Sequence, residues 1–132
     1  MAGGRGRARR GSLGHRRPVG VNPRRGEVWL VDFGEPIGRE QAGQRPAVVV
    51  SADPLNDSRA GVVIVIPTTR SRRGLPSHVE VDTAISGLDE VGYAKCEDVK
   101  SVSERRLVGR LGRIDVEAQS DIDRALRFLL DL

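Results

Sequence analysis

Hydrophobic residues in this chain occur in short runs separated by polar, turn-forming segments, a pattern typical of a protein built mainly from β-strands. The runs predict strands over residues 27–33, 45–51, 61–69, 78–82, 91–96, 99–102 and 107–114. Residues 47–50 are continuously apolar, which indicates a strand buried on both faces, whereas residues 78–82 alternate as a half-buried strand does. Many short strands joined by turns favour a small barrel or sandwich.

The end of the chain predicts one α-helix. Asp115 is a good N-cap, and Glu117 suits the positive end of the helix dipole. The apolar residues that follow recur with helical spacing and form a single stripe, made of Ile122, Ala125, Leu126, Leu129 and Leu130. We expect this stripe to pack on the sheet, with part of it serving a dimer. The fold class expected is therefore mainly β (α+β), a small β-barrel with a C-terminal α-helix.

Charge is distributed unevenly along the chain. Residues 1–25 hold eight arginines and no acidic residue, whereas the other 107 residues hold 14 basic and 18 acidic groups. Residues 1–23 contain almost no large apolar side chains, so we predict a disordered basic tail followed by one domain over residues 24–132. The tail is either a nucleic-acid-binding arm or an extended start of translation, and both interpretations stay open.

Composition also excludes several classes of protein. The one cysteine, Cys96, rules out an intrachain disulfide and fits a reducing compartment. No apolar run is long enough to cross a membrane and no secretory signal is visible, so we expect a cytoplasmic protein without membrane contact. Cys96 lies in a predicted strand beside Lys95, where a buried structural thiol is favoured over a nucleophile. No metal-ligand spacing, Walker loop or dinucleotide motif is present, and we expect neither metal nor cofactor.

The most distinctive segment is a polar loop, residues 34–44, that leads into a hydrophobic strand through Arg45 and Pro46. Pro46 has no N–H to donate and belongs among the first residues of its strand or on a sheet edge, which puts Arg45 at the mouth of the sheet. A guanidinium there suits a phosphate, and a plain surface arginine beside a flexible loop is an equal alternative. We expect Pro67 to end the ladder of the next strand, so that Thr68 projects from its end. If the two strands pair antiparallel, Arg45 and Thr68 are neighbours.

A guanidinium and a hydroxyl can together hold one phosphate. With RNA bound, the 2′-OH can attack that phosphate in line, and Arg45 and Thr68 would stabilise the oxyanion without a metal. Arginine stays protonated in proteins, so Arg45 is assigned as a phosphate clamp and proton donor, and the general base is unassigned. Glu40 and His78 are candidate bases, although His78 is better explained as the first residue of a strand.

Four segments carry a resemblance to a known family, and they cover residues 25–32, 38–49, 67–69 and 98–102. Together they resemble the MazF/PemK family, the endoribonuclease toxins of bacterial type II toxin–antitoxin systems. The resemblance implies an SH3-like barrel with a C-terminal helix, a homodimer, and cleavage of single-stranded RNA at short sequences. It implies 2′,3′-cyclic phosphate and 5′-OH products, an acidic cognate antitoxin, and DNA binding by the toxin–antitoxin complex.

The resemblance also assigns roles to residues. The family's catalytic arginine matches Arg45, its catalytic threonine matches Thr68, and the glutamate of its first loop matches Glu40. We expect further RNA contacts from the polar and basic residues nearby, which are Arg39, Gln41, Gln44, Thr69, Arg70, Arg72 and Arg73. The arginines of the segment 70–73 have an equal alternative as solvated surface. Residues 1–23 lie outside the family pattern.

Two other functions compete with the ribonuclease. The first is a non-catalytic nucleic-acid-binding module, which the aromatic content of 3% disfavours because bases usually stack on aromatic side chains. The second is a protein-interaction module that keeps dimer and antitoxin contacts without activity. The presence of both Arg45 and Thr68 favours the enzyme.

Overall fold

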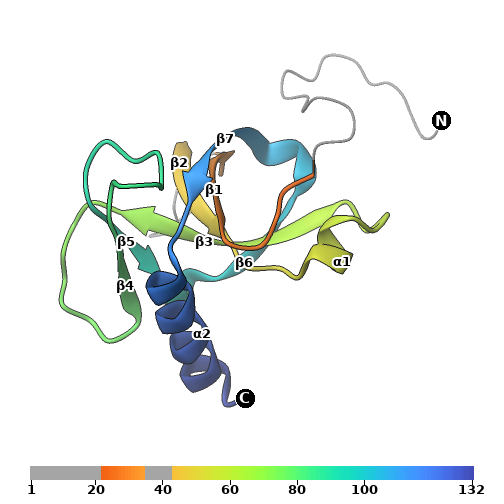
Figure 1. Cartoon of the computed structure of the whole chain (residues 1–132). Helices are drawn as coiled ribbons and strands as arrows, with labels where there is room; N and C mark the ends of the chain where they lie inside the picture. Colours follow the sequence, from red (N-terminus) through yellow and green to blue (C-terminus); the bar gives the residue numbers. More distant parts are fainter. Residues whose placement is uncertain (1–21, 35–42) are drawn as a thin grey trace.

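The computed structural model describes residues 22–34 and 43–132, in which seven strands and a C-terminal helix are arranged as Figure 1 shows. The strands are β1 (Glu27–Asp32), β2 (Gln44–Val49), β3 (Val62–Thr69), β4 (His78–Val81), β5 (Gly92–Lys95), β6 (Lys100–Ser103) and β7 (Leu107–Arg113). The helices are α1 (Asp53–Asn56) and α2 (Val116–Leu130), with 3₁₀ turns at Cys96–Asp98 and Glu104–Arg106. Each strand predicted from the hydrophobic runs is therefore confirmed.

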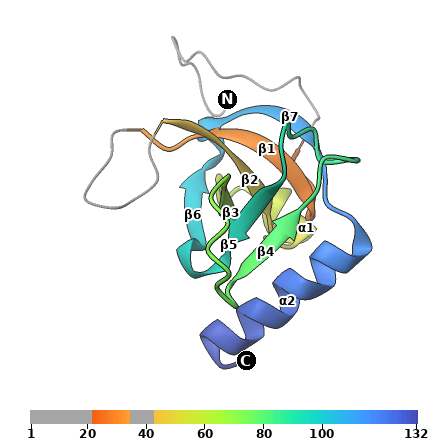
Figure 2. The same ribbon diagram turned by 90° about the vertical axis from the view of Figure 1, so that its left-hand side faces the viewer.

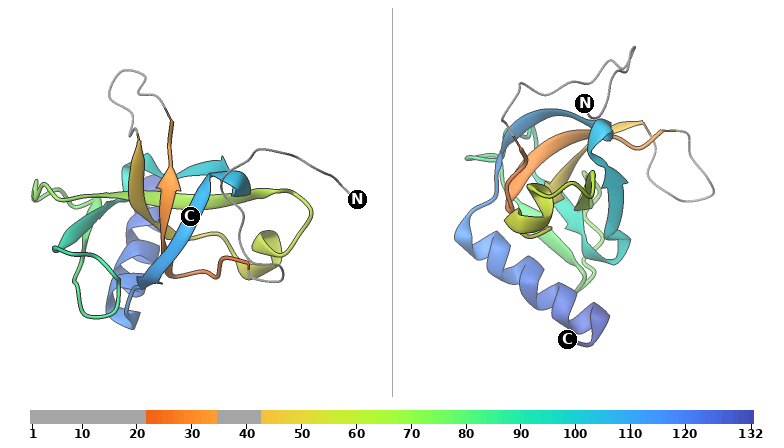
Figure 3. Two further views of the ribbon diagram at one scale, coloured as in Figure 1. Left: turned by 90° about the horizontal axis from the view of Figure 1, so that it is seen from above. Right: turned by 90° about the vertical axis from the view of Figure 1, so that its right-hand side faces the viewer.

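All strand pairs are antiparallel, and the order across the sheet is β4-β5-β3-β2-β1-β7, with β6 pairing to β3. The centre of the sheet is β3, because its start pairs with β6, its end pairs with β5, and its other edge pairs with β2. The sheet curls strongly (Figure 3), but among the described strands no pairing joins β7 to β4 or β6. The expected barrel is thus a bent sheet that is not closed.

One detail of β3 differs from expectation. Pro67 does not end the strand, because it lies opposite Ala47 of β2 and the pairing continues with Thr68 opposite Ala94 and Thr69 opposite Tyr93 of β5. On the edge of β3 that faces β5 and β6, the last pairing with β6 is at Val65 and the first with β5 is at Thr68. Pro67 therefore lies in the gap between these two partner strands. A residue that has no N–H to donate is tolerated there.

The sheet is buried on both faces by two apolar clusters. Successive residues of a strand point to opposite faces, so Val28 and Val48 enter one cluster while Trp29 and Ala47 enter the other. The first cluster is covered by α2, which packs against β4 and the 3₁₀ turn Cys96–Asp98 and runs beside β4 in Figure 2. Residues 47–49 are fully buried, which confirms a strand buried on both faces.

The helix α2 begins as predicted, because the Asp115 side chain accepts a hydrogen bond of 2.8 Å from the backbone N–H of Ala118. Its apolar stripe packs on the sheet only in the first half. Ile122 is fully buried there, and Ala125 and Leu126 are partly buried. The last turn leaves a large apolar area exposed, and its members are Phe128, Leu129, Leu130 and, just beyond the helix, Leu132.

Cys96 opens a 3₁₀ turn rather than ending a strand, and it is completely buried. Burial, together with the negative charge of Glu97, raises the pKa of the Cys96 thiol to about 12. The thiol therefore stays protonated at neutral pH and packs as a small apolar group, which agrees with the buried structural thiol favoured from the sequence.

The packed part of the chain extends back to Asn22. Pro23 is fully buried, and the Asn22 side chain donates a 3.1 Å hydrogen bond to Asp57. Arg24 bonds the same carboxylate at 2.8 Å. No helix among the described residues is long and apolar enough to cross a membrane.

Candidate active site

A cleft of about 520 Å³ opens where the start of β2, the end of β3 and the loop before β5 meet. Its lining includes five of the residues singled out from the sequence: Gln44, Arg45, Thr68, Thr69 and Arg70. The rest of the lining comes from β1, β2, β7, the loop before β5 and the first residue of β5, and consists of Leu30, Pro46, Gly87, Leu88, Asp89, Glu90, Gly92 and Leu111.

Antiparallel pairing of β2 with β3 brings the two candidate catalytic residues to this cleft. Ala47 lies opposite Pro67, so the preceding Pro46 lies beside the following Thr68. The Thr68 hydroxyl donates a hydrogen bond of 3.0 Å to the Pro46 carbonyl, and the residue is only 5% exposed. Arg45, the residue before Pro46, is exposed at the rim. The cleft therefore combines a fixed, buried hydroxyl with an accessible guanidinium.

The backbone around Arg45 is held from the other side by β1. Arg45 lies opposite the fully buried Val31, and Pro46 lies opposite Leu30. Because Val31 is anchored in the core, the position from which the Arg45 side chain starts is fixed, and the residue is exposed at the mouth of the cleft. This is the placement that phosphate recognition by a planar fork requires.

Two further residues line the cleft beyond Thr68. The Thr69 hydroxyl accepts a hydrogen bond of 3.2 Å from the Ser71 N–H, which orders the turn out of β3. Arg70 pairs with Glu90 at 3.4 Å, and the two side chains are 71% and 64% exposed. Exposed ion pairs contribute about 0–1 kcal/mol, so a phosphate can readily displace Glu90 from Arg70.

Not every predicted RNA contact reaches this cleft. Arg72 and Arg73 are exposed on the segment after β3 and are absent from the lining. Arg39, Glu40 and Gln41 lie outside the described residues. The described residues on either side of this segment are Gly34 and Gly43, and Gly43 directly precedes Gln44 of the cleft lining. The Gly43 N–H donates to the Gly34 carbonyl at 2.8 Å, which closes the stem directly before Gln44.

His78, the other candidate base, lies elsewhere. Its Nε2 atom is 2.9 Å from a carboxylate oxygen of Glu97, and its side chain is 4% exposed. Burial of Glu97 acts to raise its pKa, but hydrogen bonds from His78 and Ser77 outweigh this and lower the pKa below the usual range. His78 lines a separate groove between β4 and α2. It is not positioned to take a proton in the cleft around Thr68.

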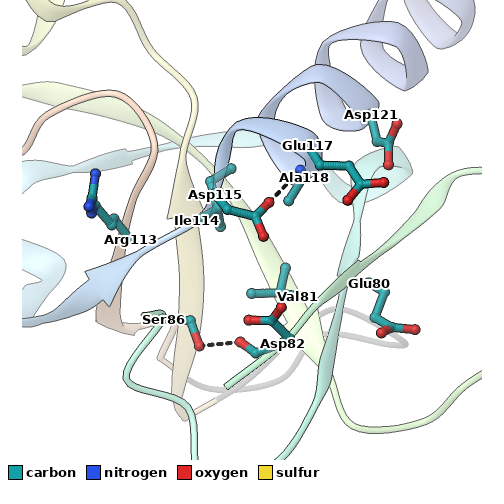
Figure 4. Close-up of a pocket in the computed structure, with 10 residues that line it drawn as sticks. All are labelled: Glu80, Val81, Asp82, Ser86, Arg113, Ile114, Asp115, Glu117, Ala118 and Asp121. Carbon is teal, nitrogen blue, oxygen red and sulfur yellow. Dashed lines mark hydrogen bonds between the residues drawn. The ribbon is translucent and has the colours of Figure 1, made fainter. Parts of the chain in front are cut away.

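A second pocket, of about 260 Å³, lies at the N-terminal end of α2 and is strongly acidic. Figure 4 shows carboxylates from β4, its following residue and α2 around it, with Asp115 engaged as the N-cap and Arg113 pointing away. Its acidic members are Glu80, Asp82, Asp115, Glu117 and Asp121. This concentration of negative charge repels phosphates, so the cleft at Arg45 is the better site for a nucleic acid.

The sequence did not reveal the wall formed by residues 87–92. The residues 87–90 have the composition of a turn before the strand predicted over residues 91–96, and nothing local shows that this turn faces the end of β3. It does so because β5 pairs with Thr68 and Thr69. The one feature of the sequence that points to this wall is a glycine at position 87. In the structure Gly87 has a φ of +79° and lies so close to the Leu111 carbonyl that there is no room for a side chain.

The groups needed for metal binding do not gather in this part of the chain. Among residues 22–34 and 43–132, no cluster of three or more His, Cys, Asp or Glu side chains is arranged to hold a metal ion. What the cleft offers a ligand is two arginines, two hydroxyls, an amide and two carboxylates.

The fold and cleft define a small, mainly β domain with one C-terminal helix and a phosphate-suited site at the mouth of two antiparallel strands. Comparison with protein families gives the same class. The family described as PemK-like, MazF-like toxins of type II toxin–antitoxin systems matches residues 24–130. The chain therefore belongs to this family.

Individual relatives are similar along nearly their whole length. The chain is 36% identical over 114 residues to endoribonuclease MazF9 of Mycobacterium tuberculosis, covering 83% of this chain and 97% of the relative. It is 30% identical over 110 residues to endoribonuclease EndoA of Bacillus subtilis, covering 83% and 95%. Among solved structures, MazF from Deinococcus radiodurans superposes with a TM-score of 0.75 at 24% identity, covering 85% of this chain and 99% of that one.

A further structure is a mycobacterial endoribonuclease in complex with its cognate antitoxin. It superposes with a TM-score of 0.70 at 25% identity, over 83% of this chain and 96% of that chain.

Proposed function

We propose that this chain is the toxin of a toxin–antitoxin pair and acts as a sequence-specific, metal-independent endoribonuclease. It cleaves single-stranded RNA and leaves a 2′,3′-cyclic phosphate and a 5′-OH. The observation that carries the proposal is the placement of Arg45 and Thr68 at one cleft, with Thr68 bonded to the residue next to Arg45. The family and the curated names of its relatives, which are endoribonucleases, support the same activity.

In the proposed reaction, a ribose 2′-oxygen attacks the adjacent phosphorus and the bond from phosphorus to the 5′-oxygen breaks. The 2′-OH proton passes to a general base, and the departing 5′-oxygen takes up a proton. Charge grows on the two non-bridging oxygens as the new bond forms. Arg45 binds these oxygens with its two parallel N–H groups, and this contact is strongest in the transition state.

Thr68 supplies a second donor to the same phosphate. Its hydroxyl now points at the Pro46 carbonyl, and rotation about one C–O bond is enough to turn the hydrogen toward a phosphoryl oxygen. Because the residue is buried, its oxygen is held in place without loss of entropy on binding. The candidate for the general base is Glu40, which the family resemblance matches to the glutamate of the first loop and which lies outside the described residues.

The RNA is proposed to run along the cleft over Gln44, Thr69 and Arg70, with Arg39 and Gln41 contacting it from the first loop. Arg72 and Arg73 act from outside the cleft, where they attract the polyanion without touching the scissile phosphate. Residues 1–21 carry six arginines and no acidic residue, and this basic segment raises RNA affinity without sequence preference.

The proposal places the chain in the cytoplasm. It also includes two protein partners. The first is a second copy of the chain, which covers the exposed apolar end of α2. The second is an acidic cognate antitoxin, whose carboxylates compete with RNA phosphates for the arginines of the cleft. A relative of similar fold has been solved in complex with its cognate antitoxin, which supports this assignment.

The test uses purified full-length protein and a 5′-labelled single-stranded RNA pool, with excess EDTA present. We expect cleavage fragments whose downstream ends accept a phosphate from polynucleotide kinase directly, as a 5′-OH does. Complete loss of cleavage in EDTA, or downstream ends that already carry a phosphate, would contradict the proposal. Tight RNA binding without any cleavage would indicate the non-catalytic module instead.

A further inference from the structure

The wall formed by residues 87–92 is a rigid part of the cleft. At its start, a Cβ on Gly87 would lie 2.1 Å from the Leu111 carbonyl oxygen, so the backbone there is in close contact with β7. At its end, a Cβ on Gly92 would meet Leu88 at 3.1 Å and the Thr68 Cβ at 3.7 Å. The wall is thus fixed at both ends. At its second end, Gly92 lies directly beside Thr68, the proposed catalytic threonine.

This wall carries two carboxylates into a cleft that is proposed to bind a polyanion. Glu90 is paired with Arg70 across the opening. Asp89 also lines the cleft and has no hydrogen-bond or ion-pair partner among the described residues. An unpaired carboxylate repels phosphates, so a residue of this kind weakens simple backbone binding. Its place is explained if it faces the bases rather than the phosphates.

An ionised carboxylate only accepts hydrogen bonds, and this restricts the base that it can face. Guanine presents two adjacent donors on its Watson–Crick edge, N1–H and the N2 amino group, which match the two carboxylate oxygens. Adenine and cytosine present one amino group next to a ring nitrogen that accepts, and uracil presents one N–H between two carbonyls. Only guanine therefore satisfies both oxygens without repulsion.

We infer that Asp89 is a specificity-determining residue that binds the Watson–Crick edge of a guanine next to the scissile phosphate. The inference rests on the proposed ribonuclease function and deepens it by naming one base of the substrate. Leu88 and Gly92 fix the backbone of the wall against Thr68, so the base and the reacting phosphate are held at a set spacing.

The experiment compares the cleavage sites of parent and variants on a random-sequence single-stranded RNA pool. Parent protein is expected to favour guanine over uracil by about tenfold or more at one position near the cut, within the range for one bidentate contact. Asp89→Asn replaces one acceptor by a donor, so the preference for guanine at that position should fall, and adenine, cytosine and uracil, which each present one donor beside one acceptor, should gain. Sequencing the new 5′ ends gives the base frequencies directly.

The matched control is Asp121→Asn, which makes the same chemical change in the acidic pocket of Figure 4, away from the cleft. Its base preference and rate should equal those of the parent. A parent profile without guanine preference, or an Asp89→Asn profile identical to the parent, overturns the inference. A uniform loss of rate at every site with unchanged preference also overturns it, because Asp89 would then serve the chemistry.

Failure of the proposed function gives a different result. A parent protein that binds the pool but produces no new 5′ ends contradicts the ribonuclease itself. Base preferences are measured only on cleaved RNA, so the two failures are separated within one experiment.

Discussion

The hydroxyl of Thr68 donates a 3.0 Å hydrogen bond to the carbonyl of Pro46, the residue that follows Arg45. This bond joins the end of β3 to the start of β2 at the point where the cleft opens. The bond links the positions of Thr68 and Arg45, the two candidate catalytic residues. A shift of β2 or of β3 therefore moves both of them. The predictions below separate their chemical roles from their structural ones.

Arg45→Lys keeps the positive charge and loses the planar fork. If Arg45 clamps the phosphoryl oxygens as charge develops, single-turnover cleavage should fall about 10²–10³-fold, the range for removing one oxyanion donor. RNA affinity should change much less, since one phosphate contact contributes little to total binding. The measurements are single-turnover rates and filter binding on one labelled RNA. Cleavage close to that of the parent would remove Arg45 from the catalytic role.

Thr68→Ser keeps the hydroxyl, whereas Thr68→Val keeps the shape and loses it. We expect the valine variant to lose about 10²-fold or more in rate and the serine variant to stay within about tenfold of the parent. The valine variant also leaves the Pro46 carbonyl without its partner, which costs about 1 kcal/mol of folding stability. Urea unfolding measures that cost separately. Equal activity of both variants would show that the hydroxyl has no role in the reaction.

Deletion of residues 1–21 removes six of the eight N-terminal arginines and stops just before the packed residues. The truncated protein should keep its melting temperature and its cleavage sites, and its RNA affinity should depend less steeply on salt. A longer deletion through residue 24 removes the buried Pro23 and the ion pair between Arg24 and Asp57, and should melt lower. Thermal melts of the two truncations distinguish the tail from the domain.

Phe128 is 82% exposed at the end of α2, where an apolar area lacks cover within the described chain. Phe128→Ser should weaken the proposed homodimer by about tenfold or more in dissociation constant, as expected for a large side chain buried on association. Sedimentation at micromolar concentration measures the effect. Arg124→Ser, one turn earlier on the helix and exposed, serves as a control. A parent protein that sediments as a monomer would contradict the dimer.

The bond between His78 and Glu97 predicts how stability depends on pH. The pKa of Glu97 is lowered in the folded state, so ionised Glu97 stabilises the fold above its usual pKa near 4.5. That contribution is lost as the pH falls through the folded-state pKa. Glu97→Gln should therefore be less stable than the parent at pH 7, and the difference in free energy of unfolding should disappear once the pH lies below the lowered folded-state pKa of Glu97. Urea titrations at several pH values provide the measurement.

Parts of this site were predictable because their determinants are local. Pro46 lies near the start of its strand, and Thr68 and Thr69 lie at the end of the next, so antiparallel pairing alone brings Arg45 close to Thr68. The α2 N-cap followed from Asp115 for the same reason.

The wall at Asp89 was not predictable in this way. Its position depends on β5 pairing with the last two residues of β3, and a turn pattern does not show which strand end it will face. Pro67 misled for a related reason. A proline ends a ladder only where a partner needs its N–H, and here β3 changes partner at that residue.

The division of β3 between its neighbours has a consequence for the order of folding. The cleft requires β2, the end of β3 and the wall that precedes β5, and the core beneath them is completed only when Ala118 and Ile122 of α2 pack. A folding intermediate that has formed these strands but has not docked α2 therefore lacks the packing that holds the walls of the cleft in place.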